Sequence, residues 1–501
     1  MTQTTVAVLG AGMVGVASAL ALQQKGFKVT LIDRRPPGEE TSYGNAGVIA
    51  RSSLMPFNNP GLFASLPSLL KNQSASFRYR PQFLLHNLSW ASRFLGNARA
   101  SVFRETTTAL DGLIKLSMTE HARLLLQSGA AHRMRDNGWL FLYRQAQSFA
   151  GGALSRERMA HFGIATEVLE RDAIRELEPA LQPIFERALW VKDTWSVDNP
   201  GAVVKAYAEL FRKQGGQYLQ ARLKTLEPLA GSRWRVVGDA GGAVEADRVV
   251  VALGPWSRNF MATLGVKVPM AYERGYHMHY AAPATGSITR PVYDTAGAYV
   301  LSPMEQGLRL TSGVELTDLD APANPQQLDL AEAAARQAIA MGERLEPTPW
   351  LGRRPTLPDS RPIIGAMPGQ RNLWLAFGHQ HIGFSTGPGT GAILAALMSG
   401  EAAPMDADGQ QPLISGSPQD QVAVLFGQRG VDRDVPRLHA IFGHVLRRKG
   451  PVVAVRNGFF LQGVFNRKAN ARRAAEVDPC RADAIGRGPV RHDDDIATVM
   501  S

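Results

Sequence analysis

The chain has 501 residues, 45% of them hydrophobic and 20% charged, a composition typical of a globular protein and not of a fibrous or disordered one. Its length exceeds the size at which one hydrophobic core stops growing, so two domains are expected. The 55 Lys and Arg exceed the 44 Asp and Glu, but the excess is diffuse and no basic stripe alternates with aromatic residues, which argues against nucleic acid as a partner. The single cysteine, Cys480, excludes an intrachain disulfide and a cysteine-based metal site.

The first forty residues predict a strand, a helix and a second strand. The apolar run Val6–Leu9 is typical of a buried parallel strand, and Met13–Lys25, rich in Ala and Leu, is expected to be helical with Gly26 as its C-terminal stop. A second strand, Val29–Ile32, ends at Asp33. This order is that of the first half of a dinucleotide-binding βαβ unit.

Three glycines, Gly10, Gly12 and Gly15, lie between the first strand and the helix. They allow a tight turn, close approach of the backbone to a pyrophosphate, and close packing of helix on strand, with the phosphates at the helix N-terminus. Asp33 stands at the spacing at which a carboxylate accepts a hydrogen bond from a ribose hydroxyl. Glycine-rich turns also occur for structural reasons, but strand, helix, second strand and acid together predict a dinucleotide site.

The residues after this acid distinguish NAD(P) from FAD. Arg34 can clamp the extra phosphate of NADP, and Ser42, Gly44 and Asn45 can simply form a loop. The segment Thr41–Gly47, however, resembles the flavin-dependent amino-acid dehydrogenase and oxidase family, and the D-amino-acid dehydrogenases in particular. In that family a Thr-Ser-aromatic-x-Asn-Ala-Gly segment follows the acid and lies along the flavin, so the resemblance favours FAD.

Later segments resemble the same family in the same order. Arg248–Trp256 is typical of a buried strand that ends in a Gly-Pro turn, although any parallel strand can end in glycine. Arg354–Gly365 and Leu373–Gly391 also match, and the second predicts a strand that delivers Gly378 to a glycine-rich loop, followed by a helix over Ala392–Met398. A helix start here would stabilise the anionic reduced flavin through its positive potential.

The resemblance implies an α/β fold (α+β mixed), with a discontinuous Rossmann-like FAD-binding domain and a sheet-plus-helices substrate domain. FAD is expected to be bound non-covalently. The implied cofactor-binding residues are Gly10, Gly12, Met13, Val14, Gly15, Asp33, Arg34, Thr41, Ser42, Asn45, Ala46, Gly47, Gly254, Gly378, Gly383, Phe384 and Thr386.

The sequence order permits a discontinuous arrangement of domains. Residues 1–60, 190–260 and 350–401 are expected to form the FAD-binding domain, 61–189 and 261–349 the substrate domain, and 402–501 a C-terminal extension of unknown structure. Within the substrate domain, Leu62–Gln127 shows helical spacing of apolar residues, whereas Val268–Glu315 is enriched in Tyr and β-branched residues and predicts strands.

The catalytic candidates are Arg354, Tyr276, His379 and His381. Arg354 is expected to bind a substrate carboxylate, because a guanidinium pairs with both oxygens and related oxidases place an arginine just before this proline; a structural ion pair is the alternative. Tyr276 matches a Lys-Gly-Tyr-like segment of relatives. The expected role of its hydroxyl is to bind the substrate carboxylate or to line the flavin, and simple packing in a strand is the alternative. His379 and His381 are expected to hydrogen-bond the flavin or to keep the substrate amine neutral before hydride transfer. A loop histidine that only packs is the alternative for each.

Three departures from the family pattern are visible. Where related glycine oxidases have an arginine after the proline of a Tyr-x-x-Pro segment, this chain has Met304, which indicates a different grip on the substrate. Gln380 stands where relatives often have glycine. His277 and His279 share one strand face and resemble a metal pair, but no carboxylate or thiol motif accompanies them, so no metal site is predicted.

The resemblance predicts an FAD-dependent D-amino-acid dehydrogenase. Such an enzyme transfers hydride from the α-carbon of a free amino acid to flavin N5, and the imino acid hydrolyses to a 2-oxo acid and ammonia. The alternatives are a glycine or sarcosine-type oxidase, a cyclic imino-acid (hydroxyproline-like) dehydrogenase, a non-catalytic flavin electron-relay subunit and a nicotinamide-dependent reductase. The expected partners are a small amino-acid substrate and an electron acceptor, either a quinone or another carrier, or oxygen.

The expected location is cytoplasmic, with peripheral contact on the inner face of the cytoplasmic membrane. The first five residues lead directly into the first strand, and no run of ~18 apolar residues is present. Val452–Val453 and Phe459–Leu461 lie between basic clusters and suggest an interfacial anchor. A loosely ordered extension after the linker Ala402–Pro418 is the preferred interpretation, and the anchor is the alternative.

Overall fold

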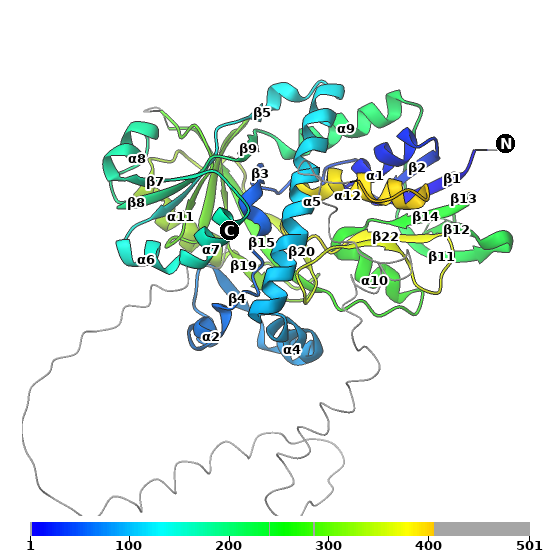
Figure 1. Ribbon diagram of the computed structural model, residues 1–501, viewed down its shortest axis with the longest axis horizontal. Helices are drawn as coiled ribbons and strands as arrows, with labels where there is room; N and C mark the ends of the chain where they lie inside the picture. Colours follow the sequence, from blue (N-terminus) through cyan, green and yellow to red (C-terminus); the bar gives the residue numbers. More distant parts are fainter. Residues whose placement is uncertain (1–2, 240, 284–285, 405–501) are drawn as a thin grey trace, which may run out of the picture. The chain divides into compact units, whose positions relative to one another are not determined.

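The computed structural model describes residues 3–239, 241–283 and 286–404 (Figure 1). The expected interfacial segments of the C-terminal extension, and all but the first residues of its linker, lie outside these ranges. The described residues form a mixed α/β fold with two large sheets. None of the helices in the described ranges is both long enough and apolar enough to cross a membrane.

The first large sheet has six strands in the order β10-β2-β1-β14-β22-β21. Its strands are β1 (Thr5–Leu9), β2 (Lys28–Asp33), β10 (Gln217–Gln220), β14 (Arg248–Val251), β21 (Ile363–Ala366) and β22 (Leu373–Phe377). All neighbours pair in parallel except β21, which is antiparallel to β22 at the edge. The carboxyl ends of β1, β14 and β22 therefore meet at one edge, where open α/β sheets bind ligands.

Beside this sheet, helix α1 (Met13–Gln24) packs against both α9 (Pro200–Lys213) and α12 (Gly383–Met398). The strand, helix and strand predicted for the first forty residues are confirmed, with ends that differ by at most one residue, and Gly26 just after α1 has a φ of 85°. A small sheet and a short helix belong to the same region. They are β11 (Leu223–Leu229), β12 (Arg233–Gly238), β13 (Ala243–Ala246) and α10 (Ser257–Ala262).

The helix expected over Ala392–Met398 begins nine residues earlier, at Gly383. The glycines that suggested a loop instead lie inside α12, where they allow close packing. A Cβ at Gly387 would lie 2.6 Å from Met13, and one at Gly391 would lie 2.6 Å from the carbonyl oxygen of Ala17. The glycines therefore let α12 pack backbone to backbone on α1.

The second large sheet follows the order β4-β19-β15-β18-β17-β16-β6-β8-β7, with β20 paired to β15. Its strands are β4 (Phe77–Tyr79), β6 (Trp139–Tyr143), β7 (Thr166–Glu170), β8 (Arg187–Val191), β15 (Ala271–Tyr280), β16 (Val292–Asp294), β17 (Tyr299–Met304), β18 (Gly307–Thr311), β19 (Val314–Leu316) and β20 (Trp350–Thr356). The strands expected between Val268 and Glu315 are confirmed. Helix α11 (Gln326–Ala338) packs on this sheet through Leu328, Ala331 and Ala335.

The remaining elements are shorter, apart from one long helix. They are β3 (Val48–Ala50), β5 (Met134–Arg135), β9 (Thr194–Val197), α2 (Leu62–Leu70), α3 (Pro81–His86), α4 (Leu88–Gly96), α5 (Ala100–Gln127), α6 (Ala146–Gly151), α7 (Ala153–His161), α8 (Arg171–Leu177) and the 3-10 helices η1 (Arg51–Leu54), η2 (Ala131–Arg133), η3 (Ala230–Ser232) and η4 (Gly254–Trp256). The helical character expected for Leu62–Gln127 is thus present, interrupted by β4.

Helix α5 packs against both large parts of the fold, as Figure 1 shows. Leu113 and Leu124 belong to a hydrophobic cluster with α1 and α12, whereas Phe103 and Ile114 belong to a cluster with β6 and β8. Strand β20, expected in the FAD-binding domain, pairs with β15 of the second sheet. The division into two discontinuous domains stays a prediction, because α5 and β20 join the two parts.

Candidate active site

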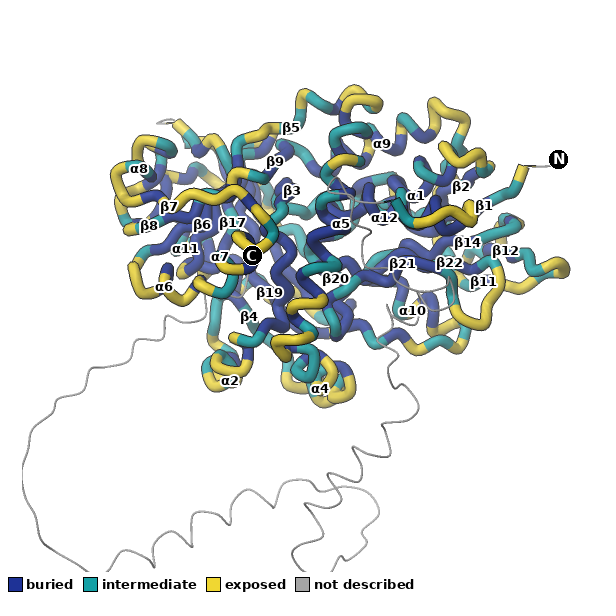
Figure 2. The backbone as a smooth tube through the Cα atoms, viewed as in Figure 1, coloured by how far each residue is buried: buried dark blue, intermediate teal, exposed yellow. Residues whose placement is uncertain are grey.

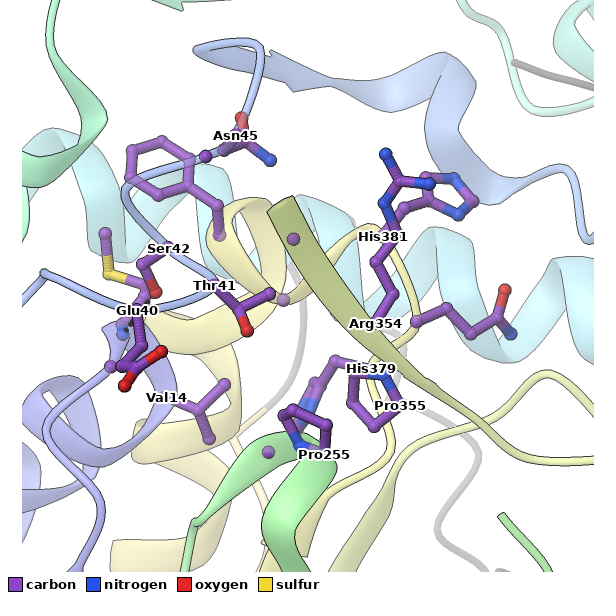
Figure 3. Close-up of a pocket in the computed structure, with 18 of the residues that line it drawn as sticks. Val14, Glu40, Thr41, Ser42, Asn45, Pro255, Arg354, Pro355, His379 and His381 are labelled. Atoms are coloured by element: carbon purple, nitrogen blue, oxygen red, sulfur yellow. Dashed lines mark hydrogen bonds between the residues drawn. The ribbon is translucent and has the colours of Figure 1, made fainter. Parts of the chain in front are cut away.

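A cavity of about 520 Å³ lies between the carboxyl edge of the six-stranded sheet and the second large sheet. This volume is within the range of ~300–1,000 Å³ common for cofactor and ligand sites. Figure 3 shows Glu40 and Ser42 on one side of the cavity, and Arg354 and His381 on the opposite side. Segments from distant parts of the sequence therefore form one site.

Most of the residues predicted from sequence line this cavity. They are Gly10, Gly12, Met13, Val14, Asp33, Arg34, Thr41, Ser42, Asn45, Ala46, Gly254, Tyr276, Arg354, His379, His381, Gly383 and Phe384.

Four predicted cofactor residues lie behind the lining. A Cβ at Gly15 would lie 1.8 Å from the carbonyl oxygen of Gly10, so this glycine permits the approach of helix and turn. Gly47 and Gly378 have φ angles of 75° and 87°, which favour glycine. The Thr386 hydroxyl donates a hydrogen bond within α12 to the carbonyl of residue 382. These residues shape the wall and are not part of its surface.

The glycine-rich turn approaches other backbone closely, and two of its amides hold the side chains of Asp33 and Ser42 at the start of α1. The φ of Gly10 is 110°, and a Cβ there would lie 2.3 Å from the carbonyl oxygen of Ala252. The Ala11 amide donates to Asp33 Oδ2 at 2.6 Å, and the Met13 amide donates to Ser42 Oγ at 2.9 Å. A turn with room for backbone approach at a helix N-terminus suits a pyrophosphate.

Asp33 retains access to the cavity from the end of β2. Burial raises the pKa of its carboxyl group, while hydrogen bonds from the amides of Ala11 and Arg35 act in the opposite direction. The carboxylate oxygens can accept hydrogen bonds from a ribose.

Arg34 is held by two neighbours. Its guanidinium bonds Glu40 Oε1 at 2.7 Å and lies 4.2 Å from the centre of the Trp256 ring. Glu40 also lines the cavity, and its carboxylate would repel the extra phosphate of NADP. This placement argues against the NADP alternative. Sequence reasoning missed Glu40, although its position six residues after Arg34 in the same loop was a usable signal.

Arg354 is the cation of the opposite wall. Its guanidinium lies over Gly275 of β15, where an added Cβ would be 2.6 Å from Nη2. In the part of the chain that the structure describes, it donates no hydrogen bond, and the buried Glu273, its cross-strand neighbour, is the charged group that faces it. Burial lowers the pKa of Arg354, and Glu273 counteracts this, but a guanidinium stays charged. A cation in this setting can receive an anionic group.

Glu273 was not singled out from the sequence. It is 4% exposed and lines the cavity. Burial raises the pKa of its carboxyl group, and Thr356 and Arg354 oppose the rise. The signal was its place two residues before Gly275, which on a strand puts both residues on one face.

Although Tyr276 borders the cavity, its side chain lies on the other face of the sheet from that of Glu273. It pairs with Leu351 across the strands, whereas Glu273 pairs with Arg354, so strand alternation separates Tyr276 from the cation. Its ring packs in the cluster beneath α11, and its hydroxyl accepts a hydrogen bond from the Asn324 amide at 2.6 Å. This placement favours packing and does not support a bond from the hydroxyl to the substrate.

His379 and His381 follow β22 and lie just before α12. His379 is 3% exposed, and its Nε2 is 2.9 Å from the Thr390 hydroxyl. Burial lowers the pKa of His379 to about 3, so its ring is neutral near neutral pH. A neutral imidazole has one donor and one acceptor nitrogen, so His379 does not supply a positive charge.

His277 and His279 do share one face of β15, as predicted, with ring centres 5.1 Å apart. Each has another environment: the His277 ring stacks on Trp350 at 4.8 Å, and Arg309 donates to His279 Nε2 at 2.9 Å. Among the described residues, no group of three or more His, Cys, Asp or Glu is placed to hold a metal ion.

The chain is similar to solved and characterised proteins over most of its length. A D-amino-acid oxidase from Bradyrhizobium diazoefficiens is 31% identical over 404 residues, which cover 79% of this chain and 95% of that protein. A D-amino acid dehydrogenase from Dechloromonas aromatica is 30% identical over 408 residues, which cover 79% and 97%. The structure of a glycine oxidase from Bacillus cereus has a TM-score of 0.58 at 17% identity, covers 79% of this chain and 95% of that chain, and shows the common fold alone.

Residues 5–397 match the family described as FAD dependent oxidoreductase, also called DAO. FAD is the cofactor of this family, and the residues of the cavity fit it. The glycine turn and Ser42 can meet a pyrophosphate, Asp33 a ribose, and the start of α12 the electron-rich end of a reduced flavin. Because the match covers most of the chain and both relatives are aligned over nearly their full length, the protein belongs to the family of FAD dependent oxidoreductases.

Proposed function

We propose that this FAD-dependent amino-acid oxidoreductase is a dehydrogenase of free D-amino acids. The products are the 2-oxo acid and ammonia, formed by oxidation of the amino acid to an imine and addition of water. FAD, when bound, accepts the hydride of the α-carbon, and a second acceptor then removes the electrons. The names of the two similar proteins from Bradyrhizobium diazoefficiens and Dechloromonas aromatica support the D-enantiomer.

The observation that carries the proposal is the guanidinium of Arg354. A free amino acid brings a carboxylate, and a buried carboxylate needs a cation with matching hydrogen bonds. Arg354 provides both donors, lines the cavity, and has no hydrogen-bond acceptor of its own in the described ranges. Because the ring of His379 is neutral, the cation for the substrate carboxylate on this wall is Arg354, next to Glu273.

The side-chain pocket is expected to be apolar and aromatic. Trp139, Tyr293, Tyr299 and Val300 line the same cavity from β6, β16 and β17. Three of these side chains are buried in the second sheet. They exclude water from the reacting carbon and favour an apolar substrate side chain over a charged one.

The proposed acceptor is a quinone or another carrier, reached by peripheral contact with a membrane. The region α2–α4 supports this contact, because residues 62–96 contain four basic residues, Lys71, Arg78, Arg80 and Arg93, and no Asp or Glu. Four large apolar side chains in this region are exposed, namely Phe63 (48%), Leu70 (70%), Leu85 (66%) and Leu88 (62%). Figure 2 shows exposed outer turns on α2 and α4. Apolar side chains among basic ones are typical of surfaces that bind anionic lipid.

An anaerobic absorbance titration tests the proposal. The flavin of the purified full-length protein is titrated with D-amino acids, their L-enantiomers, glycine, sarcosine and L-proline. We expect bleaching by apolar D-amino acids and slow return of colour when oxygen is admitted. Bleaching by glycine, sarcosine or L-proline alone would contradict the substrate class, fast return with oxygen would contradict the dehydrogenase, and no bleaching would indicate an electron-relay subunit.

A further inference from the structure

The cofactor-side loop Thr41–Gly47 is held from outside the cavity by the second large sheet. Ser42, Asn45 and Ala46 face the cavity. The carbonyl oxygens of Tyr43 and Asn45 instead accept hydrogen bonds from Nη1 of Arg309, at 2.8 and 2.5 Å. One side chain of the sheet therefore bonds the two carbonyls that flank Gly44.

Arg309 lies on β18 and is only 3% exposed. Its guanidinium is 5.2 Å from the centre of the Tyr43 ring, and no carboxylate forms an ion pair with it among the described residues. Burying a cation without a direct counter-ion is costly. The loop carbonyls and one histidine thus take the place that a carboxylate usually has.

That histidine is His279, which pairs with Arg309 across β15 and β18. Arg309 Nε donates to His279 Nε2 at 2.9 Å, and His279 Nδ1 contacts a carboxylate oxygen of Glu346. Because arginine only donates, Nε2 must carry a lone pair, so the proton is on Nδ1 and is donated to Glu346. Glu346, His279 and Arg309 therefore form one directed chain of hydrogen bonds that ends at the loop.

The loop has a second contact with the same sheet. Gly44 lies against the Trp350 ring, where an added Cβ would be only 1.8 Å from a ring carbon. Trp350 stacks on His277 at 4.8 Å, and Tyr43 lies 5.6 Å from His277 between ring centres. The close approach leaves the loop little freedom to move away from Arg309.

We propose that Arg309 is a positioning residue for FAD. It fixes the loop so that Ser42, Asn45 and Ala46 face the cofactor, and His279 and Glu346 hold its guanidinium in place. The inference depends on FAD binding, which the whole family shares, and is independent of the amino acid oxidised. It explains why a buried arginine bonds main-chain carbonyls across two parts of the fold.

The test compares Arg309→Met, which removes the donors but keeps the length of the side chain, with Arg309→Lys. The dissociation constant of FAD is measured from the flavin released when the full-length holoprotein is diluted, and the Tm is measured with FAD in excess. We expect about tenfold weaker FAD binding for Arg309→Met, because two charge-assisted hydrogen bonds are lost, and a smaller change for Arg309→Lys.

Arg144→Met is the matched control. Arg144 belongs to the same part of the fold and bonds Asp294, Gln337 and the carbonyl of Ala334, without a contact to the loop. FAD affinity should be unchanged in this variant even where its Tm falls. Unchanged FAD affinity in Arg309→Met would overturn the proposal. So would a loss of FAD affinity in Arg144→Met that is as large, relative to its fall in Tm, as the loss in Arg309→Met.

The pH dependence of FAD affinity distinguishes the hydrogen-bonded chain from a role of Arg309 in packing alone. The charged and titratable groups around His279 are Arg309 on β18, Glu346 in the segment before β20, His277 on its own strand and Tyr43 in the loop. Burial and Arg309 lower the pKa of His279, and Glu346 opposes them. Protonation would place an N–H group against Arg309, so FAD affinity should fall in acid. Glu346→Gln should shift that fall to lower pH, and an identical profile would contradict the chain of bonds.

Discussion

The guanidinium of Arg354 occupies the space that a side chain at Gly275 would need, since an added Cβ would lie 2.6 Å from Nη2 and 3.0 Å from Cζ. The two residues are on neighbouring strands, β20 and β15. Because the obstructing atoms are the end of a flexible side chain, Gly275→Ala should fold and should displace Arg354. We expect a ten- to 100-fold rise in KM for D-amino acids, since small misplacements of a binding group have effects of about this size.

The control for this prediction is Gly96→Ala, because an added Cβ at Gly96 has open space around it. Steady-state kinetics and the flavin spectrum are measured for both variants. An unchanged KM in Gly275→Ala, with a normal flavin spectrum, would show that the substrate carboxylate is not bound at Arg354.

Substitution of Arg354 itself tests the carboxylate clamp directly. Arg354→Met should lower kcat/KM by about 100-fold or more, because the buried carboxylate of the substrate would lose its cation. Arg354→Lys keeps the charge but not the planar pair of donors, so a smaller loss is expected. Anaerobic stopped-flow reduction separates the binding step from hydride transfer. If both variants reduce as fast as the unaltered enzyme at low substrate, the clamp is elsewhere.

The cofactor half of the site was predictable because its signals are local. Gly10, Gly12 and Asp33 lie within one strand–helix–strand unit. The residue type alone indicates the role of each: the glycines allow the close approach of the backbone, and the acid can bind a ribose. The α12 helix was misplaced for a related reason. Glycine is a poor helix former, so Gly387 and Gly391 indicated a loop until their packing on α1 was visible.

The residues that the sequence did not reveal depend on long-range register. Glu273 faces Arg354 only because β15 and β20 pair with that alignment, although the two residues are 81 positions apart. The same holds for Arg309 and His279, which meet through the pairing of β15 with β18. Tyr276 did carry a sequence signal, its match to a Lys-Gly-Tyr-like segment, but only the register reveals that its side chain packs beneath α11.

His379 predicts a dependence of stability on pH. Its pKa is about 3 in the folded protein because of burial, against about 6.5 for an ordinary histidine. Between these values the unfolded chain binds a proton that the folded chain does not, so its contribution to stability is lost as the pH falls below about 6.5. His379→Asn removes this pH-dependent loss. The difference in Tm between the unaltered protein and His379→Asn should therefore become smaller as the pH is lowered from 7.5 to 5.

The matched control is His132→Asn, since His132 is an exposed histidine in the middle of η2. Thermal unfolding is followed for the three proteins with FAD in excess at each pH. A gap between His379→Asn and the unaltered protein that stays constant with pH would contradict the assignment of a buried, neutral ring.

Specific membrane contact through the α2–α4 region can be distinguished from non-specific adhesion by comparing substitutions of exposed leucines inside and outside this region. Leu85 and Leu88 are 66% and 62% exposed in a stretch without acidic residues, whereas Leu126, at 72%, is equally exposed on the last turn of α5. Leu85→Asp with Leu88→Asp should reduce co-sedimentation of the full-length protein with vesicles of anionic phospholipid several-fold, and Leu126→Asp should have little effect. Binding should also weaken as salt is raised, because the basic side chains are screened.

Equal binding to vesicles of neutral lipid would exclude an electrostatic contribution. Equal loss in both variants, or binding that the double variant keeps in full, would place the contact elsewhere on the chain.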